Sequence, residues 1–156
     1  MKGKKTTAKR VVRTSMMKNK LIALLKKEGR VKASNTTGGN RSLIARSTGV
    51  INKSNTVVIA HTEILNRRSQ SINVTVIVID WDSGSPVVLS STNRNISANS
   101  FSSFSTNVAN VDFHYEVVVV LPTTNNVIVN NFGTTAGFVP QEGSTVLDRD
   151  LVTIRL

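Results

Sequence analysis

The sequence predicts an all-β fold, an antiparallel β-sandwich of jelly-roll type, behind a basic N-terminal arm. Beyond residue 41 the chain is rich in Val, Ile, Thr, Ser and Asn, which favour strands and turns over helices. Turn residues recur at short intervals there and divide the chain into eight short segments. Eight short strands with polar turns are typical of a sandwich or a barrel. With 156 residues, the chain suits a single domain that buries its own core.

The first segment, residues 1–32, is a basic arm. The chain has a formal net charge of +11, and this excess lies entirely in the arm, since basic and acidic residues balance from Ala33 onward. Such a segment is suited to phosphate, to anionic lipid or to an acidic protein surface. The residues that we expect to contact a polyanion or another partner are Lys2, Lys4, Lys5, Lys9, Arg10, Arg13, Lys18, Lys20, Lys26, Lys27, Arg30 and Lys32.

Within the arm, residues 14–29 are expected to form a short amphipathic helix. Thr14 or Ser15 can cap its start, and Gly29 can end it. The apolar residues follow a helical spacing and form one stripe, which we predict to be an assembly surface: Met17, Leu21, Leu24 and Leu25. A helix of this length is marginal alone, so the stripe should dock on protein. Membrane binding is disfavoured, because the stripe has no aromatic anchor.

Residues 33–41 form a polar, Gly-containing linker, and residues 42–156 form the sandwich domain. The predicted strands of this domain are 42–50, 56–65, 72–80, 86–90, 100–106, 113–121, 126–131 and 145–155.

Alternation of side chains assigns the faces of two strands. Ile72, Val74, Val76 and Val78 should share one face of the third strand, while its other face is apolar only toward the end. The strand at 113–121 is apolar on both faces near its end, which predicts that its outer face is covered by the N-terminal helix or by a neighbouring subunit. With 4% aromatic residues, the core should be mainly aliphatic, with these larger members: Trp81, Phe101, Phe104, Phe113 and Phe132.

The residues needed for catalysis are sparse, and we predict that the chain is not an enzyme. It has no cysteine and two histidines, His61 and His114, both expected within strands rather than in a nucleophile elbow. No phosphate-binding loop is present, because Gly38-Gly39 precedes neither a lysine nor a helix. We therefore expect no cofactor and no small-molecule substrate. A lone ligand-binding sandwich is also disfavoured, since Trp81 and Tyr115 are the only Trp and Tyr.

Two pairs of carboxylates are spaced so that each could share one face of a strand, namely Asp80 with Asp82 and Asp148 with Asp150. Each pair could hold a hard cation such as calcium or act as acid and base. Structural roles are favoured, because the first pair adjoins a Ser-Gly-Ser-Pro turn and the second encloses Arg149.

A secretory signal peptide is not expected, because the apolar stretch at 21–25 runs directly into Lys26 and Lys27. No apolar run approaches the roughly 20 residues that cross a bilayer.

The segments INVTVIVIDWDSGSPVVLSS (72–91) and PQEGSTVLDRDLVTIRL (140–156) resemble small surface proteins of Bacillus-type spores, the jelly-roll subunits of endospore appendages and exosporium fibres. The likeness covers the body from Gly49 to the end and rests on the style of strands and turns. It implies a self-assembling fibre subunit on a spore or cell surface, whose N-terminal extension links neighbouring subunits. The chain departs from that pattern in having no cysteine and in carrying a basic arm with a helix, so the linkage would be non-covalent.

A second resemblance is architectural. Small icosahedral coat proteins, notably those of plant satellite viruses, also place a basic arm and a short helix before a jelly roll rich in Val, Thr and Asn. That resemblance implies a virion protein whose arm neutralises packaged RNA, with binding that weakens steeply as salt rises. Because the arm has no stacking aromatics, any such binding should be independent of nucleotide sequence.

Overall fold

The computed structural model describes residues 19, 22–24 and 43–156 of the chain. Of the helix predicted at 14–29, the four described residues are helical. The predicted linker at 33–41 and the rest of the arm lie outside the described residues. The chain divides into two compact units, and the larger one, Ser42–Arg155, is the β-sandwich body.

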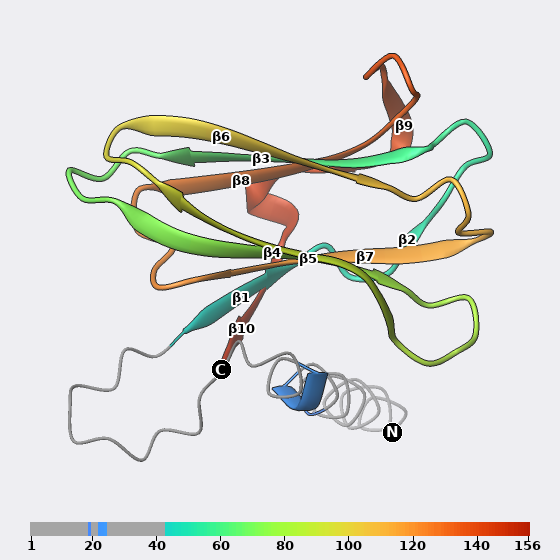
Figure 1. The fold of residues 1–156 in the computed structure, drawn as a ribbon, viewed down its shortest axis with the longest axis horizontal. Coiled ribbons are helices and arrows are strands. Elements are labelled where there is room, and N and C mark those ends of the chain that lie inside the picture. Colours follow the sequence, from blue (N-terminus) through green and yellow to red (C-terminus); the bar gives the residue numbers. More distant parts are fainter. Residues whose placement is uncertain (1–18, 20–21, 25–42) are drawn as a thin grey trace, which may run out of the picture. The chain divides into compact units, whose positions relative to one another are not determined.

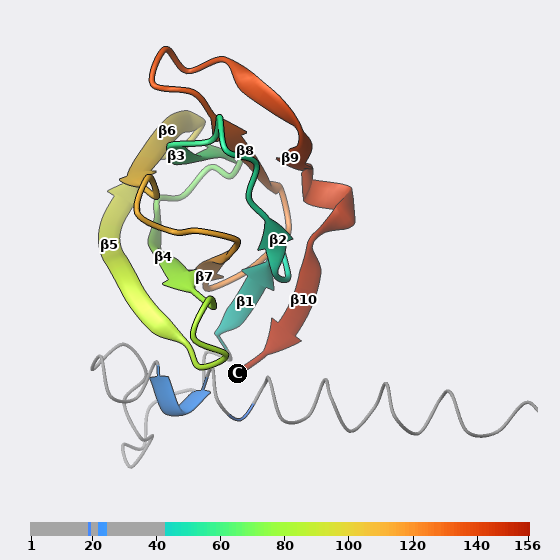
Figure 2. The same ribbon diagram turned by 90° about the vertical axis from the view of Figure 1, so that its right-hand side faces the viewer.

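The body is an all-β sandwich of two antiparallel sheets packed against each other, as the sequence predicts (Figures 1 and 2). We call the sheet with the order β10-β1-β7-β4-β5, in which β2 also pairs with β7, the first sheet. The second sheet has the order β6-β3-β8-β9. The strands are β1 (Ile44–Ser47), β2 (Ile51–Asn52), β3 (Ile59–Asn66), β4 (Ile72–Asp80), β5 (Val87–Ile96), β6 (Ser100–Asn107), β7 (His114–Leu121), β8 (Val127–Thr134), β9 (Pro140–Val146) and β10 (Val152–Arg155).

The core lies between the two sheets and is mainly aliphatic. The predicted inner face of β4 is confirmed, because Ile72, Val74, Val76 and Val78 all belong to the core cluster. Facing them, β3 contributes Ala60 and Ile64, and β8 contributes Val127 and Val129, which are buried in the same cluster. Alternate residues of these strands therefore form the hydrophobic interior.

The first sheet is also buried on its outer face. Tyr115, Val117, Val119 and Leu121 of β7 lie in the core cluster, so the alternate residues of β7 face outward. Five buried apolar residues do not belong to that cluster, and the strand registers place them side by side on the outer face: Ala45, Ile77, Ile79, Val118 and Val120. The prediction that β7 is buried on both faces is thus confirmed.

Not every predicted strand is correct. The segment predicted at 145–155 is two strands, β9 and β10, which lie in different sheets and are separated by the 3-10 turn η1 (Asp148–Asp150). The strand predicted at 86–90 extends to Ile96, because its polar second half still pairs with β4. The short strand β2 was not predicted.

The predicted aromatic core is wrong in part. Phe104 is buried, but Phe101 is 57% exposed and Phe113 is 63% exposed. Phe101 and Phe104 are three positions apart on β6, so the pleat directs them to opposite faces. Phe132 and Trp81 are half-buried, and the fully buried aromatic side chain is Tyr115.

Candidate functional site

The predicted assembly and polyanion-binding residues of the arm lie almost entirely outside the described residues. Leu24 is described, as a half-buried helical residue, whereas Met17, Leu21, Leu25 and all twelve basic residues of the arm are not. The described chain therefore offers three kinds of candidate site: the carboxylate groups, the histidine groups and the exposed surfaces of the sheets.

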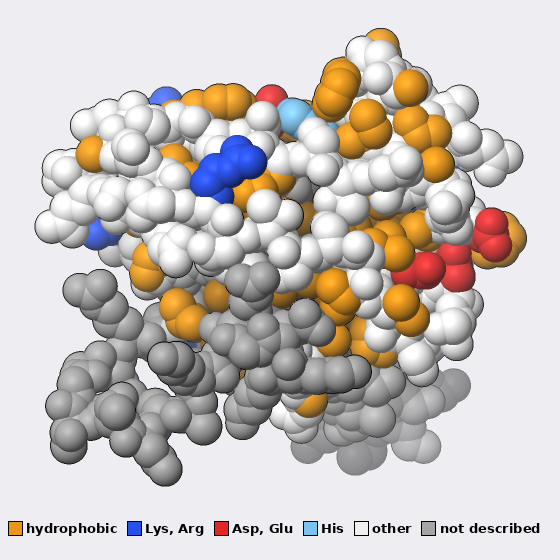
Figure 3. Space-filling model, in the orientation of Figure 1, with side chains coloured by type: hydrophobic (Ala, Val, Ile, Leu, Met, Phe, Trp, Pro, Cys, Tyr) orange, Lys and Arg blue, Asp and Glu red, His pale blue; other side chains and the backbone are white. Residues whose placement is uncertain are grey.

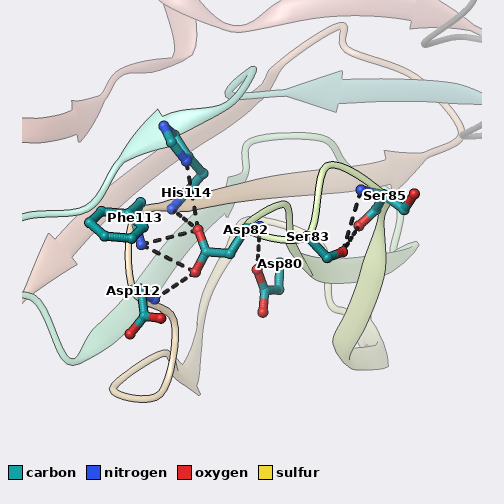
Figure 4. Close-up of polar contacts among 7 residues, drawn as sticks. All are labelled: Asp80, Asp82, Ser83, Ser85, Asp112, Phe113 and His114. Carbon is teal, nitrogen blue, oxygen red and sulfur yellow. Dashed lines mark hydrogen bonds and ion pairs between the residues drawn. The ribbon is translucent and has the colours of Figure 1, made fainter.

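The Asp80–Asp82 pair holds together the end of β4 and the segment that enters β7 (Figure 4). The Asp82 carboxylate accepts hydrogen bonds from the backbone N–H groups of Asp112 at 2.6 Å, Phe113 at 3.1 Å and His114 at 2.6 Å. Its Oδ1 also lies 3.6 Å from Nδ1 of His114. Asp80 accepts the N–H of Asp82 at 2.8 Å, which closes the turn.

These bonds determine the charge state of Asp82. Burial alone would raise the pKa of Asp82, but the three backbone N–H donors and the His114 ring outweigh it, so the pKa lies below the ordinary 3.8. Both carboxylate oxygens already accept hydrogen bonds from N–H groups, which fits a structural role better than a cation site. We call Asp82 together with its partners Asp112, Phe113 and His114 the Asp82 clasp. Among the described residues, no group of three or more His, Asp or Glu side chains could hold a metal ion.

The Asp148–Asp150 pair lies in η1, so the expectation that both side chains share one face of a strand is wrong. Asp148 accepts the N–H of Val129 at 3.1 Å and lies 3.2 Å from the guanidinium of Arg46, which also donates to the Asp148 carbonyl. Asp150 lies 3.7 Å from Arg149 and is exposed. Because the two carboxylates have different partners, they do not form a paired site.

Glu116 is a buried carboxylate that the sequence analysis did not identify. It lies on the outer face of β7, where its carboxylate accepts hydrogen bonds from the Ser47 hydroxyl and, at 2.9 Å, from the Trp81 indole N–H. Burial raises the pKa of Glu116, and the two hydrogen bonds offset this only in part. A signal was available, because Glu116 is the one charged side chain within the apolar run that ends at Leu121.

His61 belongs to a mixed cluster on the outer face of the second sheet. Its Nδ1 lies 3.0 Å from the Ser105 hydroxyl, its Nε2 lies 3.6 Å from the Glu63 carboxylate, and its ring meets Phe138 edge-on at 5.5 Å. Ser105 of β6 lies opposite His61, Glu63 lies two residues further along β3 on the same open face, and 3.6 Å is longer than a hydrogen bond. This geometry fits cross-strand contacts better than a nucleophile with its base.

His114 lies at the start of β7, beside Asp82, and belongs to the clasp. The two histidines thus lie in different sheets, and the structure does not bring them together.

The exposed apolar side chains mark the surfaces that a partner could cover (Figure 3). Val87 and Leu89 lie on β5, Val152 lies on β10, and both strands form edges of the first sheet. Phe101 of β6 is opposite Leu65 of β3 on the outer face of the second sheet. Phe138, which is 54% exposed, packs against His61 on that same face.

Among the described residues, no helix has the length and apolar character needed to cross a membrane. Compared with protein-family models, with curated proteins and with solved structures, the chain gives no match.

Proposed function

We propose that the chain is a structural, self-assembling subunit of a fibre or appendage on a spore or cell surface, and that it is not an enzyme. In this proposal, the N-terminal arm links neighbouring subunits without covalent bonds. The observation that carries it is the contrast between a β-sandwich with little net charge, whose two sheets have edge strands, and an arm that holds the excess positive charge. Such a division suits an assembly in which the sandwich is the building block and the arm is the connector.

The strand edges support assembly. β5 is ten residues long and forms one edge of the first sheet, where backbone groups can pair with another strand. Part of this edge already contacts β6, through Ser90 with Thr106 and Arg94 with Ser102. The exposed Val87 and Leu89 of β5 add apolar contact area beside its backbone groups. An extended segment of a neighbouring subunit could complete this edge, and a head-to-tail contact that does not close produces a filament.

We further propose that the sandwich is a jelly roll. The strand order supports this, because β1 pairs with β7, β3 pairs with β6, and β4 pairs with β5, as in a long hairpin that is rolled up. The pairing of β7 with β4 then links two of these pairs within the first sheet. Jelly rolls are common in shells and fibres, although a fold alone does not determine function.

The arm has the properties of a non-covalent connector. The stripe Met17, Leu21, Leu24 and Leu25 supplies apolar contact, and the surrounding lysines supply charge. Disulfide linkage is impossible, because the sequence contains no cysteine.

The second candidate is a small icosahedral coat protein in a virion. The observation that favours it is the twelve basic residues of the arm, which could neutralise the phosphates of packaged RNA. Under this alternative the arm binds nucleic acid rather than a neighbouring subunit.

Negative-stain microscopy of the intact protein, with the ratio of ultraviolet absorbance at the nucleic-acid and protein maxima measured on the same sample, tests the proposal. We expect filaments without nucleic acid, and a protein without residues 1–32 should no longer polymerise. Round, closed particles that carry nucleic acid and release it at high salt would instead establish the coat-protein function. The variant His114→Gln serves as a control, because His114 lies at the start of β7 and the variant should assemble like the original protein.

A further inference from the structure

We propose that the outer face of the second sheet is the docking surface for the arm helix of a neighbouring copy. This inference rests on the proposed function and names the surface that the connector uses. The docking surface consists of an apolar group and an aromatic group that includes His61, with a polar strip between them. Leu65, Phe101 and Ile128 form one group, His61, Phe132 and Phe138 form the other, and Glu63, Ser103 and Asn130 lie between them.

The strand registers establish that these residues share one face. Phe101 and Ile128 are both opposite Leu65, while Ser105 and Phe132 are both opposite His61. The alternate residues of β3, including Ala60 and Ile64, belong to the core. The docking surface is therefore continuous across three strands, on the side away from the core.

Exposure distinguishes this face from the outer face of the first sheet. Phe101 and Phe138 are more than half exposed, and Leu65, Ile128 and Phe132 are only half-buried. In Figure 3, hydrophobic side chains lie along the upper side of the molecule, above β3 and β6, with an acidic side chain, a histidine and a basic side chain near them. When an apolar partner covers a surface of this kind, the free energy of the system falls, because apolar area is removed from water.

Charge orients the arm on the surface. The strands β3, β6, β8 and β9 contain Glu63 and Glu142 and no Lys or Arg. Two arginines flank these strands, because Arg67 follows β3 and is exposed, and Arg94 of β5 donates to the Ser103 carbonyl at 3.0 Å. In the predicted helix, Lys18 lies on one side of the apolar stripe, and Lys20 and Lys27 lie on the other. The lysines can meet Glu63 and the carbonyl groups of the sheet while the stripe faces the aromatic side chains. Apolar contact then supplies most of the affinity, and the charges orient the arm.

The length of the apolar stripe matches the spacing of the two groups on the docking surface. The stripe runs from Met17 to Leu25, about 12 Å along a helix. The two groups are centred at His61 and Leu65, about 13 Å apart along a strand. One helix of this length can therefore contact both groups with Glu63 beneath its middle.

Photo-crosslinking of the full chain tests the docking surface. A benzoyl-phenylalanine replaces Leu21, and ¹⁴N-labelled and ¹⁵N-labelled chains are mixed, assembled and irradiated. We expect cross-links from position 21 to β3, β6 or β8, with a share that joins a light chain to a heavy chain. Two results, in filaments that still form, would overturn the docking surface and leave the fibre function standing. One is that no cross-link joins a ¹⁴N chain to a ¹⁵N chain, and the other is that the cross-links reach another surface. Failure of the intact, unlabelled chain to assemble would overturn the fibre function and this inference with it.

Surface variants of the full chain provide a second measurement. Phe101→Ser and Phe138→Ser should each raise the critical concentration for assembly about tenfold, because each removes an exposed ring from the contact. Phe113→Ser is the matched control, since Phe113 is also more than half exposed but precedes β7 in the other sheet. Equal effects of the three substitutions would contradict the docking surface.

Discussion

The two sheets of the sandwich share a core but differ on their outer faces. On the first sheet, Ile77 and Val118 lie opposite each other and are fully buried, although both point away from the core. On the second sheet, Leu65 and Phe101 lie opposite each other in the same way, and Phe101 is 57% exposed. Substitutions on the first face should therefore act on folding, whereas substitutions on the second should act on assembly.

A buried charge gives the largest expected contrast. Ile77→Asp should lower the free energy of unfolding by about 3–5 kcal/mol, because it places an unpaired carboxylate where no water reaches it. Ile128→Asp, on the outer face of the second sheet, should cost about 1 kcal/mol, since Ile128 is only half-buried. Urea denaturation measures both values, and equal costs would remove the distinction between the two faces.

The inner face of the second sheet should tolerate change as poorly as any part of the core. A Cβ atom at Gly133 would lie 2.5 Å from the Ser144 Cβ and 2.8 Å from the Tyr115 hydroxyl oxygen. Gly133→Ala should therefore cost about 2–3 kcal/mol through overpacking. At Gly137 the nearest atom would be 3.8 Å away, and Gly137→Ala should change the stability by less than about 0.5 kcal/mol. Thermal unfolding of the two variants makes the comparison, and a benign Gly133→Ala would contradict the tight inner packing.

The Asp82 clasp should stabilise the first sheet in a pH-dependent way. Because the pKa of Asp82 is lowered below 3.8, its contribution is present above that pH and is lost as the pH falls through the folded-state pKa. Asp82→Asn should unfold at a lower temperature than the original protein at neutral pH, and the difference should shrink below about pH 4. Asp150→Asn, at an exposed position, is the control. A difference that does not depend on pH would show that the carboxylate charge is unimportant.

Glu116 should show the opposite pH dependence with a smaller effect. Burial raises the pKa of Glu116, so the folded state holds its proton more tightly, and stability falls as the pH rises from 4.5 through the raised pKa. Glu116→Gln removes this loss and keeps groups that can bond Ser47 and Trp81. Relative to the original protein, the variant should gain stability as the pH rises toward neutrality. Glu63→Gln, on the open outer face, should not show this gain, and a constant deficit for Glu116→Gln would contradict the account.

The alternation of side chains between the two faces of a strand made much of this fold predictable, and it also explains why Phe101 was placed wrongly. The faces of β4 and the two-sided burial of β7 follow from apolar residues at alternate or consecutive positions. Composition, by contrast, suggested that Phe101 and Phe113 belong to the core, and neither does. The split of the last predicted strand at η1 depends on Asp148 contacting Arg46 and Val129, which are distant in sequence. No local pattern reveals such contacts.

The candidate surfaces were less predictable than the fold. The carboxylate pairs were visible in the sequence, but the N–H groups that bond the Asp82 carboxylate come from Asp112 and Phe113, before β7, and from His114, its first residue. The outer surface of the second sheet combines residues from three strands and a loop, and its aromatic members become neighbours only through the strand register. Its function therefore has to be tested in the assembled state.

Hydroxyl-radical footprinting of dispersed and assembled protein tests this account most directly, because it reads the exposure of individual phenylalanines. We predict that oxidation of Phe101 and Phe138 falls sharply when the chains assemble, while oxidation of Phe113 stays unchanged. Unchanged oxidation of Phe101 and Phe138 in assembled protein, or protection of Phe113 instead, would contradict the claim that the open face of the second sheet is the assembly surface.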